Sequence, residues 1–494
     1  MSFGYNYNFI FKILVVLILS YSSFNNIFAD SFLEIDFTRA EPHEALSAGD
    51  GTVYIDNKNS FSLPLKNIDI NKKIDFFVGN SLFRRNWVAA PSIKMSSDGL
   101  GPFFNGSSCE SCHINDGRGH PPGTFINNND DTTSIVLAIG IPPQNEFQNA
   151  QISSLRLKLI PDPTYGSQIN DNSIEGILPE GSIKLEYQYF PILLDNGQLV
   201  TLRKPNYTIE NLNYGPLHSE IRISARVAQP MIGLGLIEQI DISDVIANES
   251  KQNIHLSSIS GKVSHVWDDR LNKKSYGLFG WKASQPSIIN QTVDALHHDM
   301  GLSSSLYPNG NNCSEKQHKC KSMETGNSPN QNNVEVSDEQ INLIIFYQKH
   351  LSVPARRNVD GLNILSGKKI FFESGCASCH VQKYKTKFNA NDKSVSEQLI
   401  WPYSDFLLHD MGEGLADDLS EYTASGREWR TTPLWGIGLT ETVNGHTALL
   451  HDGRARNILE AILWHGGESK SSRDKIIKLS IKEISQLVDF IESL

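Results

Sequence analysis

The sequence repeats one short pattern, Cys-x-x-Cys-His, at residues 109–113 and again at 376–380. The cysteine and histidine content of this 494-residue chain would produce that pattern about 0.002 times by chance, so two copies are not accidental. One helical turn sets both thiols where they can form thioethers with two vinyl groups, and the histidine then faces an iron. This is the attachment pattern of c-type haem. The alternative is a pair of zinc or redox Cys-x-x-Cys sites, each followed by a chance histidine.

We therefore predict two covalently bound haem c groups. The attachment residues are Cys109, Cys112, Cys376 and Cys379, and the proximal iron ligands are His113 and His380.

The N-terminal residues 1–29 have the features of a secretory signal peptide. Lys12 is their one charge, an apolar run at 13–19 is too short to cross a bilayer of about 30 Å, and Ala29 is a small residue suited to cleavage. Cleavage is favoured over a retained anchor. We expect a periplasmic protein with no transmembrane segment after signal cleavage, which agrees with haem attachment outside the cytoplasm.

The remaining cysteines, Cys313 and Cys320, bracket a polar loop, and we predict a local, structural disulfide between them. Two free thiols or a dithiol redox site are the alternatives. The chain carries 44 basic and 55 acidic residues, so it lacks the positive field that nucleic acid requires.

Short apolar helices ending in phenylalanine precede both motifs, at 79–83 and 367–372, and the stretch 226–236 resembles 430–439. These echoes predict two related modules. Between the first motif and Arg226, short alternating or continuous apolar runs are separated by turn residues and predict strands at 134–139, 155–160, 183–190 and 199–203.

The predicted fold is mainly α, with two cytochrome c-like haem modules, the first of which carries a β-rich insertion. The predicted boundaries are 1–29 for the signal peptide, 30–133 for the first part of module 1, 134–225 for the insertion, 226–340 for the second part of module 1, and 341–494 for module 2.

A second axial ligand decides whether each iron is closed or open. A helix at 455–465 places Ile458, Ile462 and His465 on one apolar face, from which His465 could reach the second iron. Met411, in a loop after the second motif, is the competing ligand, with core packing as its other explanation.

An acid ends the helix that follows Pro286. Asp299 lies on the same face as Ile288, Thr292 and Leu296, and a carboxylate at the end of an apolar helix could perform general acid–base work on a bound peroxide. The alternative is an exposed acid at a helix end.

Nearly the whole mature chain resembles the di-haem oxidoreductase family, also described as putative thiol oxidoreductases or putative peroxidases. More distantly it resembles bacterial di-haem cytochrome c peroxidases and the methylamine dehydrogenase maturation enzyme. The stretches that carry the resemblance, besides the two motifs, are 98–105, 116–119, 280–283, 407–412, 427–431, 450–454 and 464–468.

The resemblance implies catalytic roles for Trp281, as an electron relay between the haems, for Gln291, and for Asp299, which stands near the position of the relatives' glutamate. Glu238 is the second candidate for that acid. The relatives place a histidine fourteen residues before the axial ligand, as His451 precedes His465. Relatives can also hold calcium between modules, but no matching ligand set supports it here.

The leading functional hypothesis is a periplasmic oxidoreductase that passes electrons from a six-coordinate haem to an open haem, where peroxide or a similar small oxidant is reduced. Its expected partner is a small electron-donor cytochrome or another periplasmic redox protein, held by a weak, charge-complementary interface. One alternative is an electron-transfer protein with both irons closed, with Met300 or another side chain on the first. The other is an oxidoreductase that acts on thiols.

Overall fold

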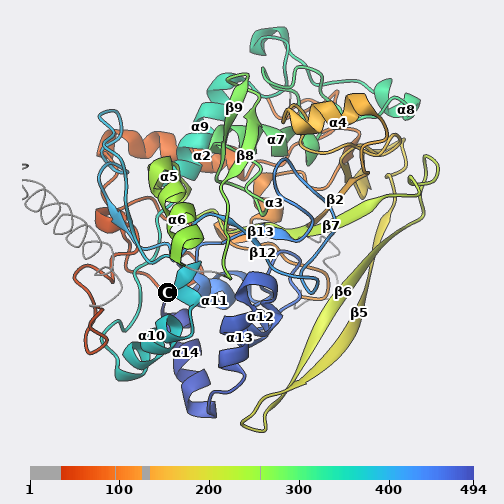
Figure 1. Ribbon diagram of the computed structural model, residues 1–494. Helices are drawn as coiled ribbons and strands as arrows, with labels where there is room; N and C mark the ends of the chain where they lie inside the picture. Colours follow the sequence, from red (N-terminus) through yellow and green to blue (C-terminus); the bar gives the residue numbers. More distant parts are fainter. Residues whose placement is uncertain (1–34, 95, 125–133, 256–257) are drawn as a thin grey trace, which may run out of the picture.

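The computed structural model describes residues 35–94, 96–124, 134–255 and 258–494 (Figure 1). The predicted signal peptide lies outside these ranges. Within them, no helix combines the length and the apolar character needed to cross a bilayer.

The first motif lies in a group of helices (Figure 1). Helix α2 (Lys73–Phe83) packs against α9 (Asp338–His350), and α9 also contacts α7 (Ile288–His298). The first four residues of the motif form the short helix α3 (Cys109–Cys112). Ser337 starts α9 with a capping box to Gln340, which satisfies main-chain N–H groups that a helix start leaves free.

The second motif has a similar setting. Helix α10 (Leu362–Glu373) precedes it, the motif begins in the 3₁₀ turn η6 (Cys376–Ser378), and α14 (Ile481–Ser493) packs along α10. Helix α12 (Ile458–Trp464) matches the centre of the helix predicted at 455–465. The other helices are α4 (Glu146–Ser153), α5 (Leu234–Glu238), α6 (Ile242–His255), α8 (His318–Lys321), α11 (Thr440–Asn444) and α13 (Lys470–Ile476).

One glycine makes the helix crossing possible in each half. A Cβ on Gly79 of α2 would lie 2.2 Å from the main-chain oxygen of Leu343 in α9. A Cβ on Gly367 of α10 would lie 1.9 Å from the main-chain oxygen of Gln486 in α14. Both glycines belong to the repeated segments noted in the sequence, so the echo corresponds to a repeated close contact between helix backbones.

The prediction of a mainly α fold is wrong. The described residues are 30% helix and 18% strand, and the strands form several small sheets. Some of these lie outside the predicted insertion, where segments of two to five residues pair because tertiary contacts bring them together, and such segments are too short to show a two-residue period. The module boundaries stay a prediction.

The strands pair as follows. One sheet has three strands in the order β3-β2-β7, which are β3 (Gln168–Ile169), β2 (Ile135–Gly140) and β7 (Arg222–Val227). Two-stranded sheets are formed by β1 (Phe103–Phe104) with β4 (Asn172–Ser173), β5 (Ser182–Leu193) with β6 (Leu199–Glu210), and β8 (Ser264–Asp268) with β9 (Lys273–Gly277). Two more are formed by β10 (Tyr384–Lys385) with β11 (Leu399–Ile400) and β12 (Leu408–Asp410) with β13 (Glu428–Arg430).

The segment 155–160, expected to be a strand, forms only an isolated bridge between Ile141 and Ile160. It begins at Leu155 with a φ of +66°, directly after α4, which leaves the chain turning rather than extended. Leu159 and Ile160 of this segment are nevertheless both buried in the core.

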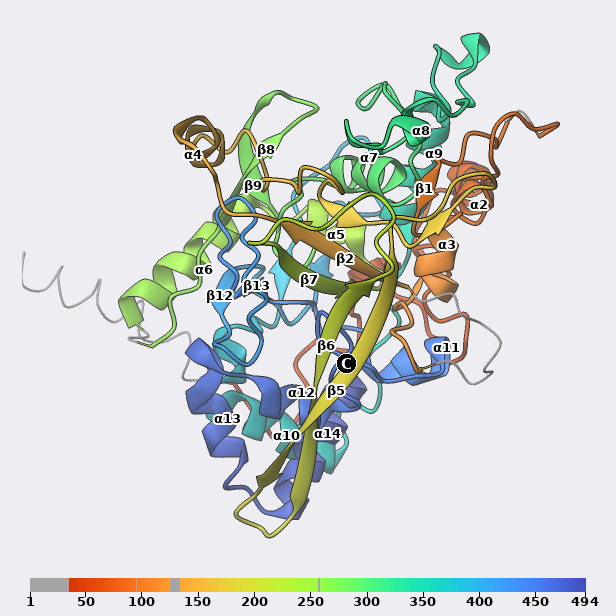
Figure 2. The ribbon, with the colours of Figure 1, turned by 90° about the vertical axis from the view of Figure 1, so that its right-hand side faces the viewer.

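The long hairpin β5–β6 projects from the first half of the chain and runs along the second (Figure 2). It turns at Asp195-Asn196-Gly197. At this tip, Asn196 Nδ2 donates to the main-chain oxygen of Leu479, 3.0 Å away. Leu202 of β6 shares a hydrophobic core with Leu463 and Trp464. The insertion therefore covers α12, which belongs to the other half of the sequence.

The N-terminal segment also crosses to the second half. Glu44 is 1% exposed and forms ion pairs with Arg356 and with Lys368 of α10. The main-chain N–H of Trp401 donates to the oxygen of Ser47. The two halves are therefore interleaved.

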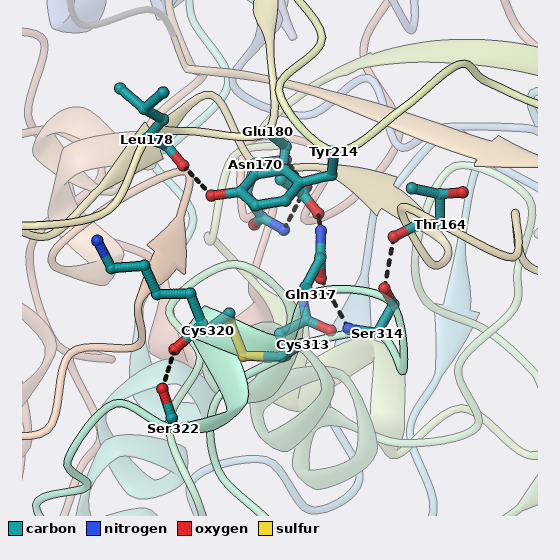
Figure 3. Close-up of a disulfide and its surroundings, with 12 residues drawn as sticks. Thr164, Asn170, Leu178, Glu180, Tyr214, Cys313, Ser314, Gln317, Cys320 and Ser322 are labelled. Atoms are coloured by element: carbon teal, nitrogen blue, oxygen red, sulfur yellow. Dashed lines mark hydrogen bonds between the residues drawn. A yellow bond between two sulfur atoms is a disulfide. The ribbon is translucent and has the colours of Figure 1, made fainter.

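Cys313 and Cys320 form the predicted disulfide, with a Cα–Cα distance of 5.8 Å (Figure 3). The loop they close presents Gln317 to the buried Glu180, which accepts its side-chain amide at 2.5 Å. Ser314 of the same loop donates to the main-chain oxygen of Thr164 at 2.6 Å. The disulfide thus fixes a loop against the insertion.

Candidate functional site

Both Cys-x-x-Cys-His motifs open into one internal cavity of about 510 Å³. The walls are mainly apolar, and the four motif cysteines and both motif histidines are among them. Further apolar lining residues come from both halves, among them Phe83, Val136, Ile237, Leu296, Phe371, Leu449, Ile458 and Ile462. The cavity therefore brings together two stretches of sequence that lie more than 250 residues apart.

In the first motif, Ser108 caps α3 by accepting the N–H of Ser111 at 3.1 Å. His113 follows the helix, and its Nδ1 lies 2.7 Å from the main-chain oxygen of Gln229. This bond leaves Nε2 as the nitrogen that can coordinate a metal. Burial lowers the pKa of His113, which favours the neutral, ligating imidazole.

The second motif repeats this bond. His380 Nδ1 lies 2.9 Å from the main-chain oxygen of Tyr403. Burial, together with the smaller effect of His465, lowers the pKa of His380 to about 4, although the bond to Tyr403 acts in the other direction. His380 and His465 line the same cavity.

His465 ends α12 and has the same bonding pattern as the two motif histidines. Its Nδ1 lies 2.7 Å from the main-chain oxygen of Ala461, and burial lowers its pKa. Met411 also lines the cavity, held by the bond from its N–H to the oxygen of Arg427. The structure thus brings both predicted ligand candidates to the cavity.

Asp299 lies beside the first motif, where its charge raises the pKa of both Cys109 and Cys112. Its side chain lines the cavity, and one oxygen accepts the Nε2 of Gln168 at 2.9 Å. Burial raises the pKa of Asp299 to about 6, while the Gln168 bond opposes that shift. A carboxyl with this pKa can gain and lose a proton near neutral pH.

Gln291 and Trp281 also line the cavity. Trp281 donates its Nε1 proton to the oxygen of Val227 at 2.8 Å. Its ring meets His451 edge to face at 6.5 Å, and His451 in turn stacks on Trp429 at 3.8 Å. Trp281, His451 and Trp429 therefore form a run of three contacting rings in the cavity wall.

The four motif cysteines suit a large apolar prosthetic group better than a metal ion. None of them is bridged in the structure, and burial raises the pKa of Cys109, Cys112 and Cys376 to about 12, so they stay protonated. Zinc requires thiolates, whereas the apolar cavity and the neutral histidines fit haem.

The sequence pattern of one protein family, described as di-haem oxidoreductase, putative peroxidase, matches residues 42–494. The chain belongs to this family. It is therefore a di-haem oxidoreductase, a family whose description implies two haems. No curated protein matches the sequence.

For this di-haem oxidoreductase, the second candidate acid, Glu238, does not line the cavity. One of its oxygens accepts the N–H of Ile288 at 3.0 Å and the other pairs with Lys349 at 2.5 Å. Glu238 therefore caps α7 from outside the cavity.

Cys379, Asp405 and His409 bring their ligand atoms within 4.8 Å of one another, a spacing that could hold a metal ion. His409 is instead enclosed by Asp405 at 2.8 Å and Glu468 at 2.7 Å. Burial opposes protonation, yet Asp405 raises the pKa of His409 well above its ordinary value. A protonated imidazole does not bind metal, and Cys379 belongs to the haem motif.

Sequence reasoning gave no role to three residues of this cavity. Gln168, which holds Asp299, comes from the insertion and carries no local signal. Arg118 and Arg430 lie in the stretches 116–119 and 427–431 that carry the family resemblance, so their motifs marked the positions without indicating what they do.

Proposed function

We propose that this chain is an exported c-type di-haem oxidoreductase that accepts single electrons at its second haem site and reduces peroxide, or a similar small oxidant, at its first. The observation that carries the proposal is the contrast between the two sites. Asp299 and Gln168 stand near the first motif, whereas a second neutral histidine, His465, stands near the second.

The holding residues follow from the cavity lining. Cys109 and Cys112 would attach one haem and Cys376 and Cys379 the other, through thioethers that the protonated, unbridged thiols are free to form. His113 and His380 would be proximal ligands, each oriented by a main-chain oxygen on Nδ1. When bound, the haems supply one-electron transfer and an iron position at which an oxidant can bind.

At the first site the protein handles the protons. Reduction of hydrogen peroxide to two waters takes up two electrons and two protons. Asp299 takes a proton from one oxygen of peroxide and returns it to the other oxygen, which leaves as water. Gln168 holds the carboxylate of Asp299 in place. Gln291 lies in the same wall and orients the oxidant.

At the second site the protein supplies a second imidazole. His465 shares the Nδ1 bond of the proximal histidines, which favours it as axial ligand over Met411. If His380 and His465 both hold the second haem, this site would have no position for an oxidant and would favour electron transfer. Trp281, between the groups that hold the two haems, is the proposed electron relay.

The partner would be a small redox protein of the periplasm that docks briefly, since weak interfaces suit electron transfer. Thiols are a less suitable substrate. Four of the six cysteines lie in the haem motifs and the other two form a disulfide.

Low-temperature electron paramagnetic resonance of the ferric holoprotein tests the proposal, because it counts open irons. We expect one high-spin and one low-spin signal. Stoichiometric peroxide should change the high-spin signal, and His465→Ala should convert the low-spin signal to high spin. Met411→Leu is the matched control and should keep the wild-type spectrum.

Two low-spin signals that do not respond to peroxide, before or after partial reduction, would contradict the enzyme. That outcome would favour an electron-transfer protein whose first iron is closed by Met300, which is 4% exposed and lines the cavity.

A further inference from the structure

Four arginines line the cavity, and they differ in what their guanidinium groups meet. Arg226 pairs with Glu421 at 2.6 Å and Arg473 pairs with Asp474 at 2.9 Å. Arg118 and Arg430 form no ion pair within the part of the chain that the structure describes. These two cations are therefore the ones whose charge the protein leaves unbalanced.

Arg430 is 6% exposed and lies at the end of β13. Its Nε donates to the main-chain oxygen of Gly280 at 2.9 Å, and a terminal nitrogen lies 3.4 Å from the side-chain oxygen of Gln229. Burial lowers the pKa of Arg430 to about 10, and no nearby acid offsets the shift. Its other N–H donors remain available to the cavity.

Arg118 is 5% exposed and follows the first motif. It donates to the main-chain oxygens of Ala448, at 2.5 Å, and Leu450. Its guanidinium lies 5.4 Å from the ring centre of Trp281. Burial lowers the pKa of Arg118 to about 10, although the charge of Asp452 acts in the other direction.

Both arginines contact the segment formed by Gly280 and Trp281, where the Nε of Arg430 donates to the oxygen of Gly280. The main-chain N–H of Arg430 donates to the oxygen of Trp281, and Arg118 lies over the ring of the same residue. An isolated buried cation is costly, and main-chain oxygens offset only part of that cost. An anion supplied from within the cavity would complete both sites, and a guanidinium fits a carboxylate in a two-bond fork.

We propose that Arg118 and Arg430 bind the carboxylate side chains of the haem groups, next to Trp281. This inference rests on the two haems of the family and not on peroxide as the substrate. The haem carboxylates would neutralise the two guanidinium groups, which in turn would keep those carboxylates ionised.

The other charged groups around this place are already paired with one another, so they do not compete for the haem carboxylates. Asp452 is held by Arg454 at 2.7 Å, and Lys282 lies 3.1 Å from Asp417. Burial alone would raise the pKa of Asp452, but Arg454 brings it down to about 2. His451 is neutral because burial lowers its pKa to about 3.

The test is a spectroelectrochemical titration of the holoprotein over a range of pH, without peroxide. In Arg430→Met and in Arg118→Met we expect the midpoint potential of at least one haem to fall, because a nearby cation disfavours the ferric form. The potential depends on pH because a haem carboxylic acid ionises. We expect the pKa of that acid, and therefore the pH at which the potential changes, to be higher in these variants, because the acid loses its proton less readily without its cationic partner.

Arg203→Met is the matched control. Arg203 also donates to two main-chain oxygens, those of Arg454 and Gly453, and lies 4.5 Å from the ring centre of Tyr187, but it does not line the cavity. Its replacement should leave both potentials and their pH dependence unchanged.

Arg430→Lys and Arg118→Lys keep the charge and remove the fork, so they cover the case in which a methionine variant does not fold. They should show a smaller fall in potential with the same direction of pH shift. If all four variants kept the wild-type pH dependence of the potential, the proposal would be overturned. This holds even if the potential fell by the same amount at every pH, because the loss of a distant charge would also produce such a fall. Because no oxidant is present, this result is independent of peroxide reduction.

Discussion

The two motif sites share a cavity, but the pKa of the buried acid near the first motif is raised and that of the buried acid near the second is lowered. Near the first motif, Asp299 faces an uncharged amide, Gln168, and its pKa is raised to about 6 by burial. Near the second, Asp405 is equally enclosed, but His409 overcomes the effect of burial and lowers its pKa. A buried acid with an amide partner can exchange a proton near neutral pH, whereas one with a cationic partner keeps its charge.

Buried acids beyond these two also show both behaviours, and Asp417 of the second half, like Asp299, has its pKa raised by burial. In the first half, burial raises the pKa of Asp116 to about 6 and that of Glu180 to about 7. In the second half, Arg454 holds the pKa of Asp452 at about 2 against the effect of burial. These shifts agree with the proposal that protons are transferred at the first site and single electrons at the second.

The largest expected effect is that of Asp299→Asn, which removes the proton-exchanging group. We expect peroxide turnover to fall by about 10²- to 10⁴-fold, as for the loss of a general acid–base group, with the ferric spectrum of the second site unchanged. In the wild type, turnover should fall as the pH drops through about 6, because the carboxylate becomes protonated. Stopped-flow measurements across pH check both.

Glu238→Gln is the control for Asp299, since Glu238 is an acid on the neighbouring helix that pairs with Lys349 outside the cavity. Its turnover should stay near that of the wild type. If Asp299→Asn kept full turnover, the proton-handling role of the first site would be lost.

Removal of the disulfide should destabilise the first half without altering the second site. The double variant Cys313→Ser, Cys320→Ser opens a loop with a sequence separation of 7, and loop closure of that size is worth about 2 to 3 kcal/mol. Urea unfolding measures the loss. Equal stability, or a changed low-spin signal from the second site, would contradict this assignment.

Glu180 should make stability depend on pH. Its pKa in the folded protein, about 7, exceeds the ordinary 4.5, so between these values the folded chain keeps a proton that the unfolded chain has released. Stability therefore falls as the pH rises through this window. Glu180→Gln should reduce this pH-dependent loss of unfolding free energy by about 1 to 2 kcal/mol. Thermal unfolding at several pH values tests this, with the exposed Glu175→Gln as the control that keeps the wild-type slope.

The smallest effect is expected for Gln168→Leu. The amide of Gln168 lowers the pKa of Asp299, so its loss should move the acid limb of the turnover profile to higher pH. Turnover at neutral pH should fall by a factor of about 3 to 5, the scale of one hydrogen bond. A lower rate with an unmoved limb would mean that Gln168 acts on the oxidant instead.

Local patterns indicated much of this site. The two motifs, the helix that ends at His465, the acid at the end of α7 and the repeated glycines of α2 and α10 are each encoded within about a dozen neighbouring residues. Their chemistry could be inferred because spacing alone fixes which side chains share a helix face.

Contacts between distant segments could not be inferred. Gln168 and Asp299 are separated by 131 residues, and nothing near Gln168 marks it. The prediction of the fold class was wrong for a similar reason. Strands such as β12 and β13 have three residues each, and they pair only once the surrounding chain is in place. That Arg430 forms no ion pair with any residue that the structure describes is likewise visible only in three dimensions.

Because the two halves are interleaved, segments that are synthesised early make contacts with segments that are synthesised much later. Glu44 finds Arg356 and Lys368 only after more than 300 further residues have been synthesised, and the β5–β6 hairpin has to wait for α12. Until then, apolar side chains of the hairpin such as Leu202 have no cover, and the nascent chain depends on chaperones or on late, whole-chain folding. Neither half is therefore a good candidate for expression as a fragment, whatever the internal repeat suggests.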